Sequence, residues 1–502
     1  MSEKIHRGKL KTPPDAAVVK YIIEPALEAD IRYRYQAFLD SNKAHVLMLA
    51  KQGIVKKDVA KAILACNDDM AKMGDRPTFP IDPSREDFYF NIEAYLIEKV
   101  GIDIGGQQHT ARSRNDLYAV CARIAVRDAY LEICKLFNDL RRTILEVARE
   151  NTDAVFAGYT HMQPSEPITF AHYCSAILSA LERDFSRIEH CYAGLNICPL
   201  GGGSMGSTTW DIDRNYTARL LGFDAPIDNS LDCVATRDYV TEILAAISMS
   251  AVTVSRFCQD LYVWATPDYG YMEVSDSCAV CSSIMPQKKN PWVLEHVKAK
   301  AAHIEGCFIS ALNVMKNVIY SHNEESSGEA ANYLFNGFEE MKRVCELTSV
   351  SFRGLILKKD HMLARARKNF CTVTELANYI VRDEKISFRT AHDIVAEVVA
   401  VTINAGKTAD QIGLDTVAPI FEKHVGRPLT MTDEEIKAAL DPSMIVEAKT
   451  CIGGTAREEV LRQLATREYA LMNDVHLTAS RQAQVSEARQ LLDKTVREFI
   501  AD

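Results

Sequence analysis

One polar segment of the chain combines residue types that suit removal of a proton from carbon. Residues 278–291 hold two serines, two lysines and an asparagine, just before a helical pattern that begins at Trp292. Abstracting a proton beside a carboxylate requires a base and strong stabilisation of the doubly charged aci-carboxylate that forms. Lys288 and Asn290 could stabilise that charge, and Ser282 could be the base if backbone N–H groups, an ammonium and exclusion of water activated it. The alternative is a capped helix entry with surface lysines.

A second polar segment, residues 109–116, opens the longest helical pattern. Unpaired N–H groups and the helix dipole favour an anion at such a helix start. Four side chains there suit a carboxylate: Arg112, Ser113, Arg114 and Asn115. By composition alone the same residues could form an ordinary helix cap with surface arginines, so both interpretations stay open.

A third segment, residues 158–164, lies just before another helical pattern and contains Thr160 and His161. A single histidine is more often a satisfied polar residue than a catalyst. The helical pattern after residues 278–291 offers a carboxylate, Glu295. A His–Glu pair can shuttle or tune protons.

These three segments carry a resemblance to a known family. Residues 281–290 are similar to the signature Gly-Ser-Ser-x-Met-Pro-x-Lys-x-Asn of the fumarase/aspartase superfamily, with Cys281 in place of glycine. The run His109-Thr-Ala-Arg-Ser-Arg-Asn-Asp resembles the His-Thr-Gly-Arg-Ser-Arg-Asn-Asp of argininosuccinate lyases, with Ala111 in place of glycine. The run Gly158-Tyr-Thr-His-Met-Gln resembles their Gly-Tyr-Thr-His-Leu-Gln. Further similarity extends over nearly the whole chain.

The resemblance implies a role for each matched residue. Ser282 would be the catalytic base, and the paired His161 and Glu295 would act as general acid or orient ligand and water. The implied catalytic set is Ser282, His161, Glu295 and Lys288, and the implied substrate-binding set is Arg112, Ser113, Arg114, Asn115, Thr160, Asn290, Tyr320, Asp87 and Glu325. Asp232 and Arg237 are interpreted as ion-pairing residues. Neither a metal nor an organic cofactor is expected.

The part of the site expected to hold the leaving amine departs from the family. The leader, residues 5–11, lacks the Trp-Gly-Gly-Arg-Phe and Ser-x-Asp elements, while Asp87 is retained and Tyr89 replaces a histidine. After Tyr320, the expected glutamine and lysine align with Glu325 and Gly328, which removes a cation that would meet a substrate carboxylate. We therefore expect a neutral, bulkier or more cationic amine.

Several functions fit this pattern. The preferred one is a lyase that releases fumarate from an N-substituted aspartate, resembling ethylenediamine-disuccinate lyase in reaction type. Cleavage of argininosuccinate itself is the first alternative. A structural, crystallin-like homologue without activity is an alternative of another class, although the catalytic set is complete. The Arg-Ser-Arg-Asn-Asp run argues against adenylosuccinate lyase and carboxymuconate cycloisomerase.

Hydrophobic periodicity predicts an all-α fold with a long central helical bundle. Four long helices are expected, over residues 117–150, 167–191, 237–266 and 292–316. From about residue 363 onward, glycines and prolines indicate shorter helical pieces. The predicted regions are an N-terminal domain (1–110), a central bundle for oligomerisation and catalysis (111–362) and a C-terminal helical domain (363–502).

Composition limits the class of protein. The 502 residues carry a formal charge of −10 without a long basic block, so no nucleic-acid partner is expected. No stretch approaches the roughly 18 apolar residues of a membrane span, so a cytoplasmic protein is expected. The small dicarboxylate substrate is what the family resemblance implies. The 14 cysteines are scattered through apolar segments, which indicates reduced thiols. The family resemblance also implies a homotetramer with active sites shared among three subunits.

Overall fold

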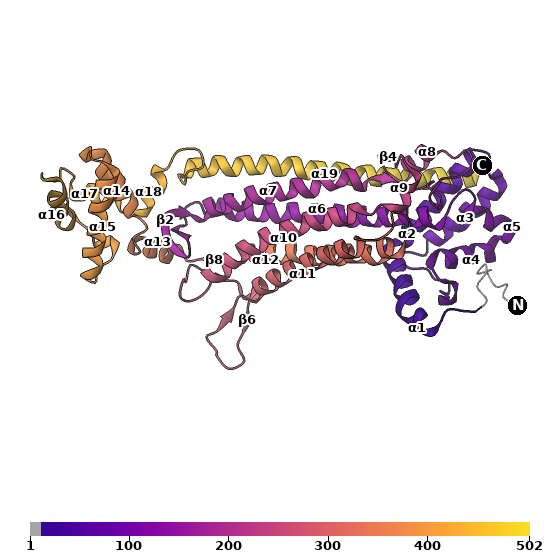
Figure 1. Cartoon of the computed structure of the whole chain (residues 1–502), viewed down its shortest axis with the longest axis horizontal. Helices are drawn as coiled ribbons and strands as arrows, with labels where there is room; N and C mark the ends of the chain where they lie inside the picture. The colour runs from indigo at the N-terminus through magenta and orange to yellow at the C-terminus, as the bar shows by residue number, and fades with distance from the viewer. Residues whose placement is uncertain (1–11) are drawn as a thin grey trace.

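The computed structural model describes residues 12–502, so the leader of residues 5–11 lies outside the described part. The chain forms an elongated helical bundle with smaller helical clusters at its two ends (Figure 1). The all-α prediction is confirmed, since the strands form only four short two-stranded sheets in the described residues.

Long helices form the bundle: α6 (Arg114–Glu150), α7 (Phe170–Leu195), α10 (Asp238–Trp264), α11 (Trp292–Met315) and α12 (Ala330–Arg353). The four predicted helices are confirmed, each within a few residues at its ends. Helix α6 runs unbroken because its sequence from Leu117 onward contains neither glycine nor proline. Its apolar residues, such as Phe137, are buried against α7 and α12 in the largest core cluster.

A further long helix, α19 (Arg457–Ala501), runs back along the bundle from the C-terminal cluster to the N-terminal one (Figure 1). The expectation of only short helices after residue 363 is therefore wrong for this stretch. Buried Val460, Leu464 and Val485 attach α19 to the bundle core. The buried Arg141 of α6 also donates to Asp474 of α19 at 2.6 Å.

The N-terminal cluster contains α2 (Glu24–Lys51), α3 (Lys57–Ala71) and α4 (Phe88–Val100), with a core of its own. That core also includes residues from the start of α6 and the end of α19, such as Leu117 and Leu492. The C-terminal cluster contains α14 (Val373–Glu384), α15 (Phe388–Asn404), α16 (Leu414–Val425) and α17 (Asp433–Ala439) around a third core. The domain boundaries at residues 110 and 362 stay a prediction.

Short elements connect these parts. The helical ones are α1 (Ala16–Val18), α5 (Ile102–Gly105), α8 (Arg214–Leu220), α9 (Ser230–Ala235), α13 (Lys359–Lys368), α18 (Pro442–Ala448), 3₁₀ turns at Pro83–Arg85, Gly106–His109, Asp276–Cys278 and Ala409–Gln411, and π turns at Val19–Ile23 and Glu325–Glu329. The antiparallel pairs are β1 (Val155–Thr160) with β2 (Gln163–Thr169), β5 (Met272–Val274) with β8 (Leu355–Leu357), and β6 (Val280–Cys281) with β7 (Lys289–Asn290). Strands β3 (Ile197–Cys198) and β4 (Ala225–Pro226) pair in parallel.

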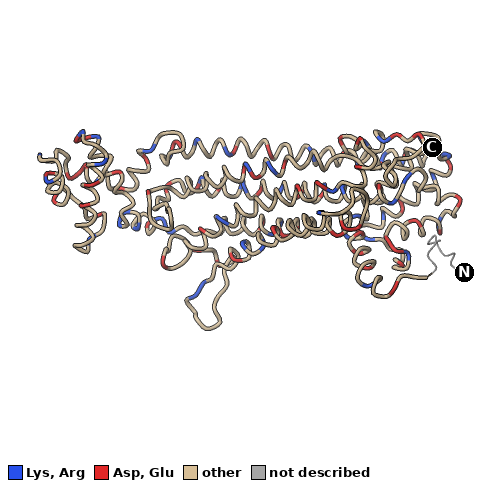
Figure 2. The backbone as a smooth tube through the Cα atoms, in the orientation of Figure 1, with Lys and Arg blue, Asp and Glu red and all other residues tan. Residues whose placement is uncertain are grey.

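Helix α10 is, among the described residues, the one helix long and apolar enough to cross a membrane by length and composition alone. More than half of its most apolar window is buried inside the protein, as in a core helix. Figure 2 shows Lys and Arg interspersed with Asp and Glu along the backbone, and a basic stretch on the loop that projects from β6.

Substitutions of two leucines in α19 test whether this helix packs against the bundle core. Leu464 is fully buried and Leu461 is 42% exposed. Because a cavity in a packed interior is costly, we expect Leu464→Ala to lower the free energy of unfolding by about 2–5 kcal/mol. We expect the matched Leu461→Ala to change it by about 0.5 kcal/mol or less. Urea denaturation measures both, and equal losses would contradict the packing of α19.

Candidate active site

A cavity of about 260 Å³ lies where the N-terminal helices meet the bundle. Asp87, Arg114 and Asn115, all predicted from the sequence, line it. They come from the starts of α4 and α6, and the rest of the wall comes from α2, the start of α10 and the segment before α12. This cavity is where predicted residues from different parts of the sequence meet.

The entry of α6 is fixed by its own cap. The Ser113 hydroxyl accepts from the Asn115 N–H at 3.3 Å, and the Asp116 carboxylate accepts from the Ser113 N–H at 2.9 Å. Asp116 also accepts from the N–H groups of Gly201 and Gly203, at 2.8 and 3.1 Å, and so ties a glycine loop to the helix start. Asn115, held by this cap, donates to the carbonyl of residue 204 at 3.1 Å.

Arg114 is oriented by a carboxylate and an aromatic ring. Its guanidinium donates to Asp87 at 2.6 Å and lies 4.6 Å from the centre of the Phe90 ring. Asp87 is itself the N-cap of α4 and accepts from the Phe90 N–H at 2.9 Å. Burial raises the pKa of Asp87, an effect that its bonds to Phe90 and Arg114 oppose.

Arg112 lies behind this cavity and does not line it. It is buried in the N-terminal cluster and donates to Asn42 at 2.9 Å, while its Nε and second Nη find no partner among the described residues. His109 lies beside it, with its ring centre 4.8 Å from that of Tyr89. Burial, Arg112 and Arg114 lower the pKa of His109 to about 3, so this histidine is neutral at pH 7.

Several cavity residues were not predicted from the sequence: Asp30, Arg34, Tyr118, His322 and Glu324. Glu324 lines the cavity, whereas the predicted Glu325 is exposed and begins the π turn. Arg237 lines it too and forms no ion pair within residues 12–502, although Glu324 is one of the charges that act on it. Its guanidinium donates to the carbonyl of Thr236 at 2.6 Å, and Asp232 accepts from Tyr320 at 2.8 Å.

The predicted Thr160 and His161 lie in a β-hairpin that the sequence did not indicate. Thr160 ends β1 and pairs with Gln163 across a two-residue turn. His161 and Met162 form that turn with φ of 54° and 58°, the left-handed values of a tight hairpin turn. Such values are strained for non-glycine residues, and they hold the exposed His161 at the tip of the hairpin.

The predicted base lies on the loop that projects between β6 and β7 (Figure 1). The Ser282 hydroxyl accepts from the backbone N–H groups of residues 284 and 285, at 3.3 and 3.1 Å. These bonds favour a negatively charged oxygen. Lys288 is exposed at the other end of the loop, and Asn290 in β7 pairs with Val280. Cys281, paired with Lys289, fits the extended backbone where the signature has glycine.

Glu295 lies in the first turn of α11, where it accepts a hydrogen bond from the Tyr262 hydroxyl of α10 at 3.1 Å. This bond raises the pKa of Tyr262. Lys298 lies 4.1 Å from the centre of the Tyr262 ring. Tyr262, itself covered by Lys298, thus orients the carboxylate that is predicted as the partner of His161.

One chain does not bring its predicted residues together. Arg114 and Asn115 begin α6, while Thr160 and His161 follow its end, and a 37-residue helix is roughly 55 Å long. The loop with Ser282 projects from the bundle away from the α6 start (Figure 1). Among residues 12–502, no group of three or more His, Cys, Asp or Glu side chains could hold a metal ion.

Comparisons with known proteins agree with the arrangement of helices and motifs. Residues 29–306 match a lyase family model and residues 370–447 match the argininosuccinate lyase C-terminal family. The chain is 43% identical to argininosuccinate lyase 1 of Shouchella clausii, over 99% of this chain and 98% of that protein. It is 36% identical to argininosuccinate lyase of Methanocaldococcus jannaschii, over 92% and 93%. The chain belongs to the argininosuccinate lyase family.

Solved structures agree with this family. The crystal structure of EDDS lyase in complex with formate superimposes with a TM-score of 0.86 at 28% identity, covering 98% of this chain and 97% of that one. The chain is therefore a member of the fumarase/aspartase superfamily and a fumarate-forming C–N lyase.

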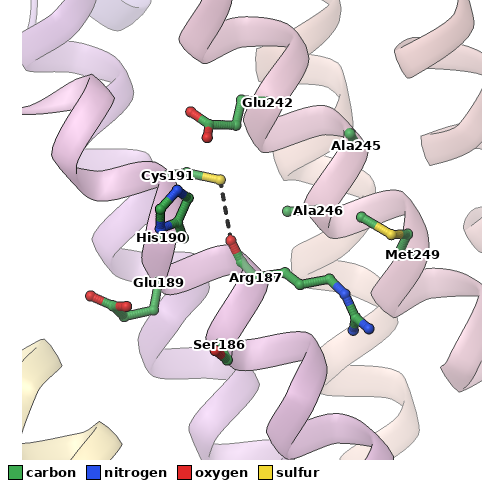
Figure 3. A pocket seen from close by; sticks show the side chains of 9 residues that line it. All are labelled: Ser186, Arg187, Glu189, His190, Cys191, Glu242, Ala245, Ala246 and Met249. Atoms are coloured by element: carbon green, nitrogen blue, oxygen red, sulfur yellow. Dashed lines mark hydrogen bonds between the residues drawn. The ribbon is translucent and has the colours of Figure 1, made fainter.

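A second cavity of the lyase, about 440 Å³, lies between α7 and α10 (Figure 3). It contains no residue of the predicted catalytic or substrate-binding sets. Its lining includes Arg187, Glu189, His190 and Glu242, and the Cys191 thiol donates to the carbonyl of residue 187 at 3.4 Å. Within one chain, this groove on the bundle surface is thus distinct from the segments that hold the predicted site residues.

The neutral His109 predicts how the stability of the lyase depends on pH. In the unfolded chain a histidine takes up a proton near pH 6.5, whereas folded His109 does so only at about pH 3. The unfolded state therefore binds more protons, and stability falls as the pH drops below about 6.5. We expect His109→Gln to reduce this slope by up to about 1.4 kcal/mol per pH unit. Urea denaturation between about pH 7 and pH 5 measures it, and an unchanged slope would refute a neutral buried His109.

Proposed function

We propose that the lyase cleaves an N-substituted aspartate by β-elimination and releases fumarate and an amine. The observation that carries this proposal is the position of Ser282, whose hydroxyl accepts two backbone N–H bonds on a loop with Lys288 and Asn290. A serine can serve as a base where N–H groups and an ammonium stabilise its alkoxide. The fold and the family place the reaction among fumarate-forming eliminations.

Bond changes in this reaction need no cofactor. Ser282 removes a proton from the carbon next to one carboxylate, and the electron pair of that C–H bond is delocalised into the carboxylate. The same electrons then form the double bond of fumarate while the C–N bond breaks. The electron pair of the C–N bond leaves with the nitrogen, which takes a proton. The aci-carboxylate is the charge that the site has to stabilise.

Most of the predicted residues have a place in this reaction. Ser113, Asn115 and Thr160 would bind the succinyl carboxylates together with Lys288 and Asn290, as predicted from the family motifs. His161, aligned by Glu295, would protonate the leaving nitrogen or orient ligand and water. Arg114 would lie at the amine side, where its pairing with Asp87 fixes its direction.

A complete site requires more than one chain. Because α6 separates Asn115 from His161 by roughly 55 Å, one substrate cannot reach both within one chain. We propose a homotetramer in which each site takes its residues from three subunits. Exposed apolar residues on the bundle helices, among them Val252, Ile309 and Leu312, support such an interface.

Argininosuccinate is the second candidate substrate, because relatives over 90% or more of the chain carry the name argininosuccinate lyase. The altered residues around the amine half favour another amine. We also propose a cytoplasmic location, which the 14 free cysteines support.

Replacement of the base tests the elimination. We expect Ser282→Ala to lower kcat by roughly 10²–10⁴-fold with little change in substrate binding, because it removes the proton acceptor alone. The absorbance of released fumarate measures the rate. Ser283→Ala, on the same loop, serves as the matched control and should lose far less. Turnover retained by Ser282→Ala would refute the assignment of the base.

Mixed assemblies test the shared sites. Asn115→Ala and Ser282→Ala should each be inactive alone, but co-expressed chains should recover up to about a quarter of the wild-type rate. In a shared site, Asn115 and Ser282 come from two different subunits. In a mixed assembly, some sites therefore receive an unmutated Asn115 and an unmutated Ser282. As a control, a Ser282→Ala chain co-expressed with a Lys288→Ala chain should recover no activity, because both residues lie on one loop and reach a site from the same subunit. No recovery in the first mixture would contradict shared sites.

A further inference from the structure

The cations of the cavity at the α6 start are already engaged. Arg34 donates to Asp30 at 2.8 Å, and Arg114 donates to Asp87 at 2.6 Å. Arg237 is buried and donates to a backbone carbonyl. The unpartnered Nε atoms of Arg34 and Arg237 are shielded from solvent, so a ligand in the cavity cannot reach them. Arg237 forms no ion pair among the described residues, but it is buried, and Glu324 of the same cavity is one of the charges that act on it. No arginine of this cavity is therefore both exposed and without a carboxylate partner, so a carboxylate on the amine half of a substrate would find no accessible unpaired cation.

One carboxylate of this cavity is open. Glu324 is exposed, and the structure gives it no hydrogen-bond or ion-pair partner within residues 12–502. Gly328 lines the cavity beside it, and a side chain at that position would come within 2.9 Å of the Glu324 carboxylate. The absence of a side chain there leaves the carboxylate accessible and provides no competing cation.

The rest of the wall is mostly neutral, apart from Glu86, whose carboxylate lies 3.9 Å from the Arg114 guanidinium. Burial, Arg237 and Arg114 lower the pKa of His322, so its ring adds no charge at pH 7. Ile22, Ile23, Ala26 and Ala29 provide an apolar side to the cavity. A short methylene chain suits that side, since it buries apolar surface without leaving a polar group unpaired.

We propose that the leaving amine is a short aliphatic chain with a positively charged end and no carboxylate, and that Glu324 binds this charge. The inference rests on the proposed elimination and names its substrate class. Glu324 would pair with an ammonium or guanidinium, while the methylene chain lies against the apolar side of the cavity. The same carboxylate would repel an amine half that ends in a carboxylate.

Three matched substrates test this inference. The first is argininosuccinate, whose leaving arginine carries an ammonium and a carboxylate. The second lacks that carboxylate and releases agmatine, and the third also lacks the ammonium and releases butylguanidine. Since a charged pair contributes about a tenfold preference, we expect kcat/KM for the agmatine-releasing compound to exceed both others by about tenfold or more. Fumarate absorbance follows all three.

Variants of Glu324 test whether this residue causes the substrate preference. Glu324→Gln should lower kcat/KM for the agmatine-releasing compound by about tenfold and change it for the butylguanidine-releasing compound by about twofold or less. Glu324→Lys should shift the preference toward argininosuccinate. Glu329→Gln, an exposed glutamate in the same turn that does not line the cavity, is the matched control and should leave the ratios unchanged.

The outcomes separate this inference from the function on which it rests. Absence of fumarate from all three compounds would overturn the proposed elimination for this substrate class. Fumarate release with argininosuccinate preferred, or with no dependence on Glu324, would overturn the inference and leave the elimination intact. Preference for the agmatine-releasing compound that Glu324→Gln abolishes supports both.

Discussion

The length of one unbroken helix determines how this lyase can build a site. A helix rises 1.5 Å per residue, so the 37 residues of α6 separate its two ends by roughly 55 Å. The motif at its start and the hairpin after its end therefore cannot contact one small substrate within one chain. Once the bundle is this long, the proposed shared site would need copies that pack side by side with their ends brought together. Such packing would cover the exposed apolar residues of the central helices.

Rigid anchors compensate for a site assembled from distant parts. The cap of α6 uses Asp116 to hold both the helix start and the glycine loop at Gly201, so Asn115 projects from a fixed frame. Ala111 and His161 adopt left-handed backbone angles of 59° and 54° at the two segments that should meet across subunits. Such strained residues persist only where surrounding contacts hold them, and they commonly lie at functional sites. The backbone conformation therefore positions these two segments as much as their side-chain contacts do.

Local patterns predicted what depends on neighbouring residues in the sequence. The ends of α6 and α11 were predictable because caps, prolines and apolar periodicity act within a few residues. Helix α19 was missed, although its 45 residues lack glycine and proline, because its sparse apolar residues gave a weak periodic signal. The hairpin around His161 was missed because neither turn residue is a glycine or asparagine. Whether Glu324 lines the cavity depends on how α12 packs against α2. Patterns of neighbouring residues in the sequence do not reveal such packing.

The chemistry and the specificity of this site obey different physical constraints. Removing the proton and stabilising the aci-carboxylate require particular groups, which we propose are those of Ser282 and Lys288, and such groups are the ones that motifs reveal. The amine has only to fit and to meet complementary charge, so its pocket can change with single substitutions. In this lyase Asp30 and Asp87 pair with Arg34 and Arg114, and Arg237 is buried. Among the described residues, the exposed charge of the cavity without a hydrogen-bond or ion-pair partner belongs to Glu324. Pairing within the cavity, more than the number of charges in it, therefore determines which amine can leave.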